Sequence, residues 1–577
     1  MSAVRLRWAL AIVCALVPLA VLAPLLGRGF TLSYDMVFVP RQDLGLDDLG
    51  LGTALPRAVP SDAGVALATT VLPGDVLQWL VLVALLAGAC LGAGLAVPSS
   101  HPAARCTAAV AYGWNPYVAE RLVQGHWALL AGYAALPWVL RAAADVRASR
   151  PRAGARLVLA MAVAALTPTG GLLATGLAAA VLGWPGPDRE VRSLGRQLAV
   201  AALLNAPWWL PTLLRPGGST SDPAGVDAFA ARAESWTGTF GSLLGLGGIW
   251  NAEAVPASRN LATAPLLTAV ALLVAAAGWT PLRRASRSTA APLAAVAGIG
   301  LLVALAGSVA PGRAALRWAV EHIAGAGLLR DGQKFVAPLA LLLALCAGMA
   351  AERLLTRLAG HPAAASAAAA LLLTLPVVGT PDLAWGVGGR LAPARYPADW
   401  AAVRAQLAHA PEPGDVVVLP FGAFRAYGWN AGRTVLDPAP RAFRQEVVVD
   451  DRLVVGGREV AGEDPRAAAV RRALDAGEPL GPLGVGWVVV EEGVPGAVPA
   501  AALAGAERRY AGPDLELYRL PGYAPATWPR PPIVPVVVVD LAAATAVLAA
   551  AWLALPTRRR KGGKPAVRAS PEIPTGW

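Results

Sequence analysis

The chain has 577 residues, of which 56% are hydrophobic and 15% are charged, and its mean hydropathy is +0.52. A soluble protein of this size does not carry so much apolar surface, so the composition indicates a polytopic α-helical membrane protein. The formal net charge of +12 lies mostly in short arginine clusters between apolar runs. This is the loop bias of membrane proteins, and it excludes a basic stripe that binds nucleic acid.

The basic residues are almost all arginine, since lysine occurs only at Lys334, Lys561 and Lys564. Together with the abundance of alanine, glycine, valine and proline, this usage points to a GC-rich genome such as that of an actinobacterium. The sequence has no CxxC motif and no cysteine–histidine cluster, so it predicts no zinc site and no redox chemistry. The four cysteines lie inside apolar stretches, at Cys14, Cys90, Cys106 and Cys346.

Apolar runs of about 17–25 residues predict about twelve membrane spans. The first run, 8–28, follows a basic start and lacks a clear cleavage site, which indicates a signal anchor. The stretch "LTPTGGL" (166–172) is either a tight turn between two short spans or a break in one long helix. The predicted spans are 8–28, 75–97, 104–119, 127–143, 155–168, 170–184, 198–214, 261–280, 290–310, 335–353, 362–379 and 533–555.

Arginine clusters orient these spans through the positive-inside rule. With the N-terminus inside, the arginine-rich segments 141–156, 187–197, 281–288 and 557–564 are all cytoplasmic, provided that 155–184 is split into two spans. The prediction is a multi-pass protein of the plasma membrane with both its N-terminus and its C-terminus in the cytoplasm. The outer segments between spans are then 29–74, 114–126, 215–260 and 311–333.

A polar block over 380–530 is long enough for a small domain on the outer face. Short runs bounded by turn residues predict strands at 414–420, 485–492 and 515–520. Amphipathic patterns predict helices at 397–410 and 464–477, and the alternation indicates a small extracytoplasmic α/β domain. The predicted organisation is a multi-span membrane domain, this α/β domain, a final transmembrane helix and a basic cytoplasmic tail, over 1–379, 380–530, 531–556 and 557–577 respectively.

Asp35 is the first candidate for chemistry, because it stands just outside the first span in "SYDMVFVPRQ" (33–42). The apolar residues after it indicate that the segment returns toward the membrane surface. Burial there raises the pKa of a carboxyl group and makes it a usable base. The alternative is an ordinary solvated loop acid, which is what we expect of Asp43, Asp47 and Asp48.

Arg330 and Lys334 in "GLLRDGQKF" (327–335) are spaced i, i+4, so one helical turn would place both cations on one face. At the outer mouth of a span they suit the phosphate of a lipid. Arginine forms bidentate hydrogen bonds with phosphate oxygens, and lysine adds a point charge. The alternative is an interfacial anchor that pairs with Asp331.

The segment "GWNPYVAERLVQGHWALL" (113–130) places polar residues in a short outer connection between two spans. Ionisable groups at membrane depth are costly and tend to be functional, so Asn115, Glu120 and His126 are candidates for a substrate cavity. Glu120 and His126 do not share a helical face, and their pairing would require a break at Gly125. The alternative is an ordinary aromatic belt at the membrane surface.

Taken together, the many spans, the outer acid Asp35 and the soluble segment resemble the GT-C superfamily of membrane glycosyltransferases. "YDMVFVPRQDL" followed by "ALPRAVPSDA" is also similar to the start of the large actinobacterial arabinofuranosyltransferases. The resemblance implies that Asp35 is the catalytic base and that Arg330 and Lys334 bind the donor phosphate. It implies a polyprenyl-phosphate-linked sugar as donor, an envelope glycan or lipid as acceptor, and membrane lipids as surroundings. The paired acid of that family is missing after Asp35, so no metal ion and no other cofactor is expected.

Two alternatives to a glycosyltransferase stay open. A transporter or flippase of a lipid-linked envelope precursor needs polar residues within its spans, and these spans are nearly free of charge. A non-catalytic membrane scaffold, whose 380–530 domain recruits envelope enzymes, is compatible with the residues. Asp35 and Lys334 lying far apart, with no cavity between them, would favour the scaffold. ATP-driven transport loses support, because the sequence has no P-loop motif.

Overall fold

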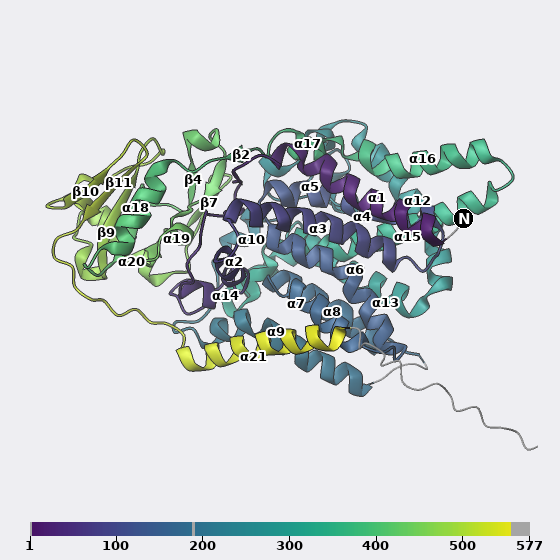
Figure 1. The fold of residues 1–577 in the computed structure, drawn as a ribbon, viewed down its shortest axis with the longest axis horizontal. Helices are drawn as coiled ribbons and strands as arrows, with labels where there is room; N and C mark the ends of the chain where they lie inside the picture. Colours follow the sequence, from purple (N-terminus) through teal and green to yellow (C-terminus); the bar gives the residue numbers. More distant parts are fainter. Residues whose placement is uncertain (1–2, 187–190, 556–577) are drawn as a thin grey trace, which may run out of the picture.

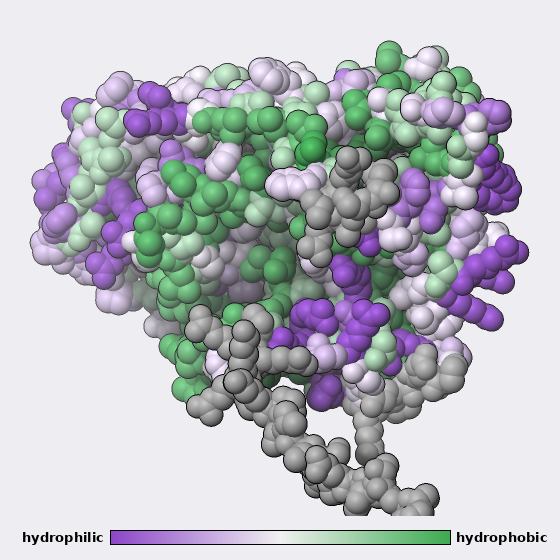
Figure 2. Space-filling model, turned by 45° about the vertical axis from the view of Figure 1, so that its right-hand side comes forward, coloured by the Kyte–Doolittle hydropathy of each residue, from purple (hydrophilic) through white to green (hydrophobic). Residues whose placement is uncertain are grey.

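The computed structural model describes residues 3–186 and 191–555, so the predicted basic tail, 557–577, lies outside the described residues. Helices fill one part of the molecule, and the main sheet lies in a separate part beyond their ends (Figure 1). Hydrophobic residues cover much of the helical surface, while hydrophilic residues gather over the sheet and at the opposite end (Figure 2). This distribution is the one expected of a protein whose helices face lipid.

Eight helices of the described chain are long and apolar enough to cross a membrane. Their apolar stretches have 18 to 26 residues, which matches the thickness of a bilayer core at about 1.5 Å per residue. They are α1 (Ala3–Leu22), α3 (Gly74–Ala96), α6 (Trp127–Arg147), α12 (Ala264–Ala285), α13 (Arg287–Ala306), α15 (Ala337–Arg357), α16 (Pro362–Gly379) and α21 (Ile533–Ala554).

The predicted span 104–119 is not one helix. It forms α4 (Pro102–Gly113) and α5 (Pro116–Val123), which are separated at Asn115. Asn115 has extended backbone angles, φ −160° and ψ 168°, and its side chain accepts a hydrogen bond from the N–H of Val118. An asparagine N-cap followed by proline starts a new helix here.

The break expected in 155–184 is present, because α7 (Ala153–Ala164) and α8 (Pro168–Gly183) are separate helices. They have 12 and 16 residues, and both are shorter than a typical span. With eight long apolar helices and these interruptions, the predicted number of about twelve spans is not confirmed. A further long helix, α9 (Val191–Leu214), packs with α7 against α21.

Helix α15 lies at the centre of the helical part, where it packs against α4, α12 and α13. Small residues allow the backbones to approach closely. A Cβ atom on Gly278 of α12 would lie 1.8 Å from the carbonyl oxygen of Cys346, and one on Gly348 would lie 2.6 Å from that of Ala104. These glycines therefore set the spacing around α15.

The main sheet has five strands in the order β10 (Glu507–Ala511), β11 (Leu515–Arg519), β9 (Val485–Glu491), β3 (Asp415–Leu419) and β6 (Val447–Val448). Strands β3 and β9 run parallel and are rich in buried valine, as is typical of strands covered on both faces. The two predicted helices are present as α18 (Ala398–His409) and α20 (Pro465–Ala476). The sequence therefore predicted three strands of this sheet, β3, β9 and β11, and both helices, but it did not predict β6 and β10.

Short elements join the sheet region, residues 393–519, to the first loop. Strand β1 (Phe30–Thr31) pairs with β2 (Pro393–Ala394), so the chain just after α1 is fixed to the start of the sheet region.

The remaining short helices and strands are α2 (Ser61–Thr69), α10 (Ala224–Ala228), α11 (Gly238–Leu244), α14 (Ala310–His322), α17 (Ala384–Gly388), α19 (Ala439–Ala442), β4 (Phe424–Ala426), β5 (Thr434–Leu436), β7 (Leu453–Val455) and β8 (Arg458–Val460).

Candidate functional site

Asp35 lies in a tight turn that the sheet region holds in place. Tyr34, the residue before it, has a φ of 44°, in the left-handed region that costs a bulky residue about 1–2 kcal/mol. Two backbone hydrogen bonds to β5 stabilise this conformation. The N–H of Tyr34 donates to Thr434 at 2.7 Å, and the N–H of Leu436 donates to Tyr34 at 2.8 Å. The position of Asp35 therefore depends on a strand 400 residues further along the chain.

The other side of this turn rests on the end of α5. The N–H of Asp35 donates to the carbonyl oxygen of Gln124 at 3.2 Å. Gly125 has a φ of +76°, and a Cβ there would lie 2.2 Å from the backbone nitrogen of Met36. The side chain of Asp35 is 45% exposed, whereas Met36 is fully buried. A buried backbone thus presents an accessible carboxylate.

His126 contacts the carboxylate of Asp35, with 3.1 Å between Nε2 and Oδ2. Its other ring nitrogen, Nδ1, lies 2.9 Å from Nη1 of Arg121. Because a guanidinium only donates, Nδ1 accepts that bond, and the ring proton is therefore on Nε2, where it donates to Asp35. One oxygen of Asp35 is engaged in this way, and the other has no partner within the described residues.

The pKa of Asp35 differs from the sequence-based expectation. Burial works to raise it, but the hydrogen bond from His126 and the positive charges of His126, Lys334 and Arg441 lower the pKa below its ordinary value. Burial and the charge of Arg121 in turn lower the pKa of His126 despite the nearby carboxylate of Asp35. Asp35 is thus an anion beside a neutral imidazole at neutral pH.

Arg121 connects this pair to Lys334. The fully buried guanidinium of Arg121 donates to both oxygens of Asp331, at 2.7 and 3.0 Å. Nζ of Lys334 lies 3.5 Å from Oδ2 of Asp331, and its ammonium also interacts electrostatically with Asp35. Burial opposes ionisation of Asp331, yet Arg121 and Lys334 hold its pKa well below the ordinary value. The structure therefore brings Asp35, His126 and Lys334 into one charged cluster.

Glu120 lies behind this cluster and does not face solvent. Its side chain is fully buried and accepts a hydrogen bond at 3.1 Å from Gln333, which also contacts Arg121. Burial and the neighbouring carboxylate of Glu234 raise the pKa of Glu120 well above its ordinary value. Glu234 itself pairs with Arg259 at 3.0 Å. Glu120 thus supports the site from inside and does not line a substrate cavity.

Arg330 is not on one helical face with Lys334. The expected turn is interrupted at Asp331, whose ψ of 75° is not helical. Arg330 instead pairs with Glu463 of the sheet region, at 3.4 Å. The same carboxylate binds Arg57, whose side chain is 51% exposed and interacts electrostatically with Asp35. Arg330 and Arg57 therefore share Glu463, and of the two it is Arg57 that interacts electrostatically with Asp35.

Arg57 has no clear signal in the sequence, because it stands in a loop with ordinary spacing. Arg121 has one, since it is an ionisable residue in an apolar outer segment. Asp331 lies between the stronger candidates Arg330 and Lys334. Within the described ranges, no group of three or more His, Cys, Asp or Glu side chains could hold a metal ion.

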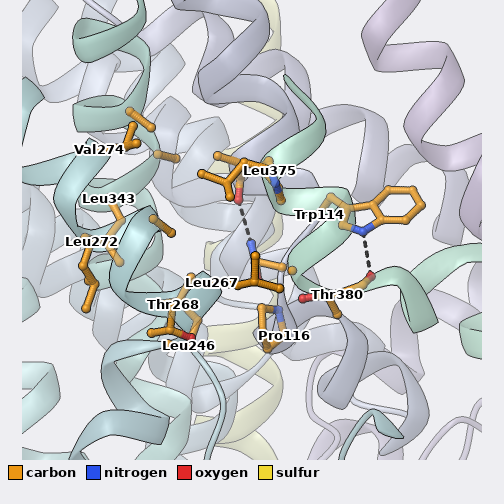
Figure 3. Close-up of a pocket in the computed structure, with 18 of the residues that line it drawn as sticks. Trp114, Pro116, Leu246, Leu267, Thr268, Leu272, Val274, Leu343, Leu375 and Thr380 are labelled. Atoms are coloured by element: carbon orange, nitrogen blue, oxygen red, sulfur yellow. Dashed lines mark hydrogen bonds between the residues drawn. The ribbon is translucent and has the colours of Figure 1, made fainter. Parts of the chain in front are cut away.

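An apolar cavity of about 110 Å³ lies between α4, α12, α15 and α16 (Figure 3). Asn115 lines it at the break between α4 and α5, and Trp114 at its edge donates to the carbonyl oxygen of Thr380 at 2.9 Å. Tyr117, two residues beyond Asn115, donates to the carbonyl oxygen of Lys334 at 3.0 Å. The first turn of α5 thus connects this cavity to the charged cluster.

No protein-family model and no curated protein matches the chain. Among solved structures, the chain is similar to the arabinofuranosyltransferase AftD from mycobacteria, with a TM-score of 0.56 and 20% identity over 90% of this chain. Two structures of a mutant of that enzyme give TM-scores of 0.54 and 0.50 with 20% and 17% identity. This chain spans about 40% of the length of AftD. The similarity confirms that the fold resembles that of an arabinofuranosyltransferase, as the start of the sequence suggested.

Proposed function

We propose that this protein is an integral membrane glycosyltransferase that moves a sugar from a polyprenyl-phosphate donor to a hydroxyl group of a cell-envelope acceptor. The observation that carries the proposal is the carboxylate of Asp35, which is accessible, is oriented by His126 and belongs to one charged cluster with Lys334. This cluster occurs in a fold shared with an arabinofuranosyltransferase.

In the proposed mechanism, the free oxygen of Asp35 accepts the proton of the acceptor hydroxyl. The hydroxyl oxygen then attacks the anomeric carbon of the sugar, and the bond between that carbon and the phosphate oxygen breaks. The lipid phosphate leaves with one more negative charge. Lys334 and Arg57 stabilise this charge, and Arg330, which is paired with Glu463, adds to the positive potential.

The cavity in Figure 3 suits the hydrocarbon part of such a donor. Its lining is mainly leucine, alanine and valine from α12, α15 and α16, and it offers no charged group to an apolar chain apart from Arg259, which is already paired with Glu234. Asn115 lines the cavity, and Tyr117 in the same turn of α5 donates to the backbone carbonyl oxygen of Lys334. A prenyl chain in this cavity would bring its phosphate toward the cluster.

The positive-inside pattern supports a site on the extracytoplasmic face, with both termini in the cytoplasm and about twelve spans. On that face nucleotide sugars are not available, which favours a lipid-linked donor. We propose the same division as the sequence indicates, with the α/β domain of 380–530 between the membrane domain and the last span. The pairing of β5 with Tyr34 gives that domain a role, because it fixes the turn that carries Asp35.

The test is the substitution Asp35→Asn, compared with Asp43→Asn in the same loop. Each variant is produced in a strain that lacks the gene, and the envelope glycan linkages are analysed. We expect Asp35→Asn to reproduce the linkages of the deletion strain and Asp43→Asn to restore the wild-type pattern. Wild-type linkages with Asp35→Asn would contradict a catalytic role and favour the scaffold.

A further inference from the structure

A second charged hollow lies apart from Asp35, between α10, the start of α14 and the β7–β8 hairpin. It has a volume of about 770 Å³ and is open to solvent. Its charged lining residues are Asp227, Arg313, Arg317, Arg458 and Glu459. We call this hollow the α14 pocket. It contains none of the residues of the proposed active site.

The acidic residues of the α14 pocket are already neutralised. Arg317 forms an ion pair with Asp227, and Glu459 pairs with Arg452 at 3.0 Å. Arg313 and Arg458 form no ion pair and no side-chain hydrogen bond with any residue in the described parts of the chain. Two free guanidinium groups thus remain, which is the charge that suits one phosphate group.

The start of α14 adds to this positive potential. The helix has 13 residues, begins at Ala310 beside the pocket and has no acidic residue in its first turn. The positive end of the helix dipole is therefore not compensated there, and such an end favours anions. Arg313 and Arg317 are one turn apart on this helix, so both lie on the same side.

Helix α14 also lies where lipid head groups are expected. Helix α13, a candidate span, ends at Ala306, only four residues before α14 begins. α14 buries Leu316 and Val320 but exposes Trp318, as is typical of a helix at a membrane surface. In Figure 1 it lies where the helical part meets the sheet region.

From this geometry we infer that the α14 pocket binds the phosphate of an anionic membrane phospholipid. The two free guanidinium groups of Arg313 and Arg458 contact the phosphate oxygens. Since Arg313 belongs to the membrane part and Arg458 to the β7–β8 hairpin, the bound head group connects the sheet region to the bilayer. This inference does not depend on the proposed transfer reaction.

The test measures lipid binding and not sugar transfer. The purified full chain in neutral detergent is titrated with phosphatidylglycerol or phosphatidylcholine, and bound lipids are counted by native mass spectrometry. The double variant Arg313→Ala/Arg458→Ala should bind phosphatidylglycerol at least roughly tenfold more weakly and lose one retained molecule. The control Arg395→Ala/Arg472→Ala removes the same charge at exposed positions outside the pocket and should behave like the wild type.

Two results would overturn the inference. One is an unchanged affinity of Arg313→Ala/Arg458→Ala for phosphatidylglycerol. The other is displacement of the retained phosphatidylglycerol by millimolar inorganic phosphate, which would identify a site for soluble anions. A third variant, Arg313→Lys/Arg458→Lys, keeps the charge but loses paired hydrogen bonds, and we expect it to bind with intermediate affinity.

Discussion

Nε2 of His126 lies 3.1 Å from Oδ2 of Asp35, and Arg121 fixes the proton on that nitrogen by donating to Nδ1. The imidazole therefore acts as a neutral donor that keeps Asp35 ionised and leaves one carboxylate oxygen for an acceptor hydroxyl. In this arrangement His126 is a positioning residue, and Asp35 is the group that would contact substrate.

His126 should control the pH at which Asp35 loses its charge. Burial raises the pKa of Asp35, and the hydrogen bond and charge of His126 lower it, so His126→Ala should raise this pKa while Lys334 and Arg441 still act to lower it. The acid limb of kcat/KM should then move toward neutral pH. His126→Gln keeps an amide donor and should show a smaller movement. An identical acid limb in wild type and His126→Ala would contradict this role.

Gly125 should be required for the position of Asp35. Gly125→Ala places a Cβ 2.2 Å from the nitrogen of Met36 and the carbonyl oxygen of Ser33, so the turn must shift. A displacement of about 1 Å can cost roughly 100-fold in rate, and we expect a loss of that order in kcat. Gly325→Ala is the matched control, since Gly325 has the same φ of +76° with no atom within 4 Å of the added Cβ. Equal activities of the two variants would show that the contact is unimportant.

Lys334 should bind the donor phosphate. Lys334→Ala removes one charge-assisted contact of about 1.5–3 kcal/mol, which corresponds to a loss of roughly 10- to 100-fold in kcat/KM for the donor. The fold should survive, because Asp331 keeps both hydrogen bonds from Arg121. Lys334→Arg should retain part of the activity. Initial rates at several donor concentrations give kcat/KM for each variant, and the thermal stability of each variant is the control for the fold.

The cavity of Figure 3 should hold the apolar chain of the donor. Ala347→Phe and Ala271→Phe place a ring in this space, since both alanines line it. Loss of room for about two methylene groups, at about 0.8 kcal/mol each, should raise the KM for a long-chain donor roughly tenfold. Ala276→Phe is the control, because Ala276 lies on α12 like Ala271, is exposed and does not line the cavity. Equal KM values in all three variants would exclude this cavity as the lipid site.

Much of the architecture could be predicted from the sequence, because it depends on local pattern. Long apolar runs gave the spans such as α3 and α12, and short valine-rich runs gave β3 and β9. The prediction was wrong where one residue interrupts a run. Asn115 divides 104–119 into two helices by capping the second, and Asp331 interrupts the turn between Arg330 and Lys334. Hydropathy does not detect the break at Asn115, since it averages over an apolar run, and i, i+4 spacing does not report the non-helical backbone at Asp331.

The sequence by itself determined that this is a helical membrane protein with a late sheet, and it identified Asp35 and Lys334 as candidates. Only the tertiary structure decided which side chains connect these two residues. The contact of Arg121 with Asp331 joins residues 210 positions apart, and the pairing of Tyr34 with β5 joins the first loop to the sheet region. Hydropathy and spacing report which residues are buried and in what element. Partners across the fold depend on packing between elements, and that information is not local.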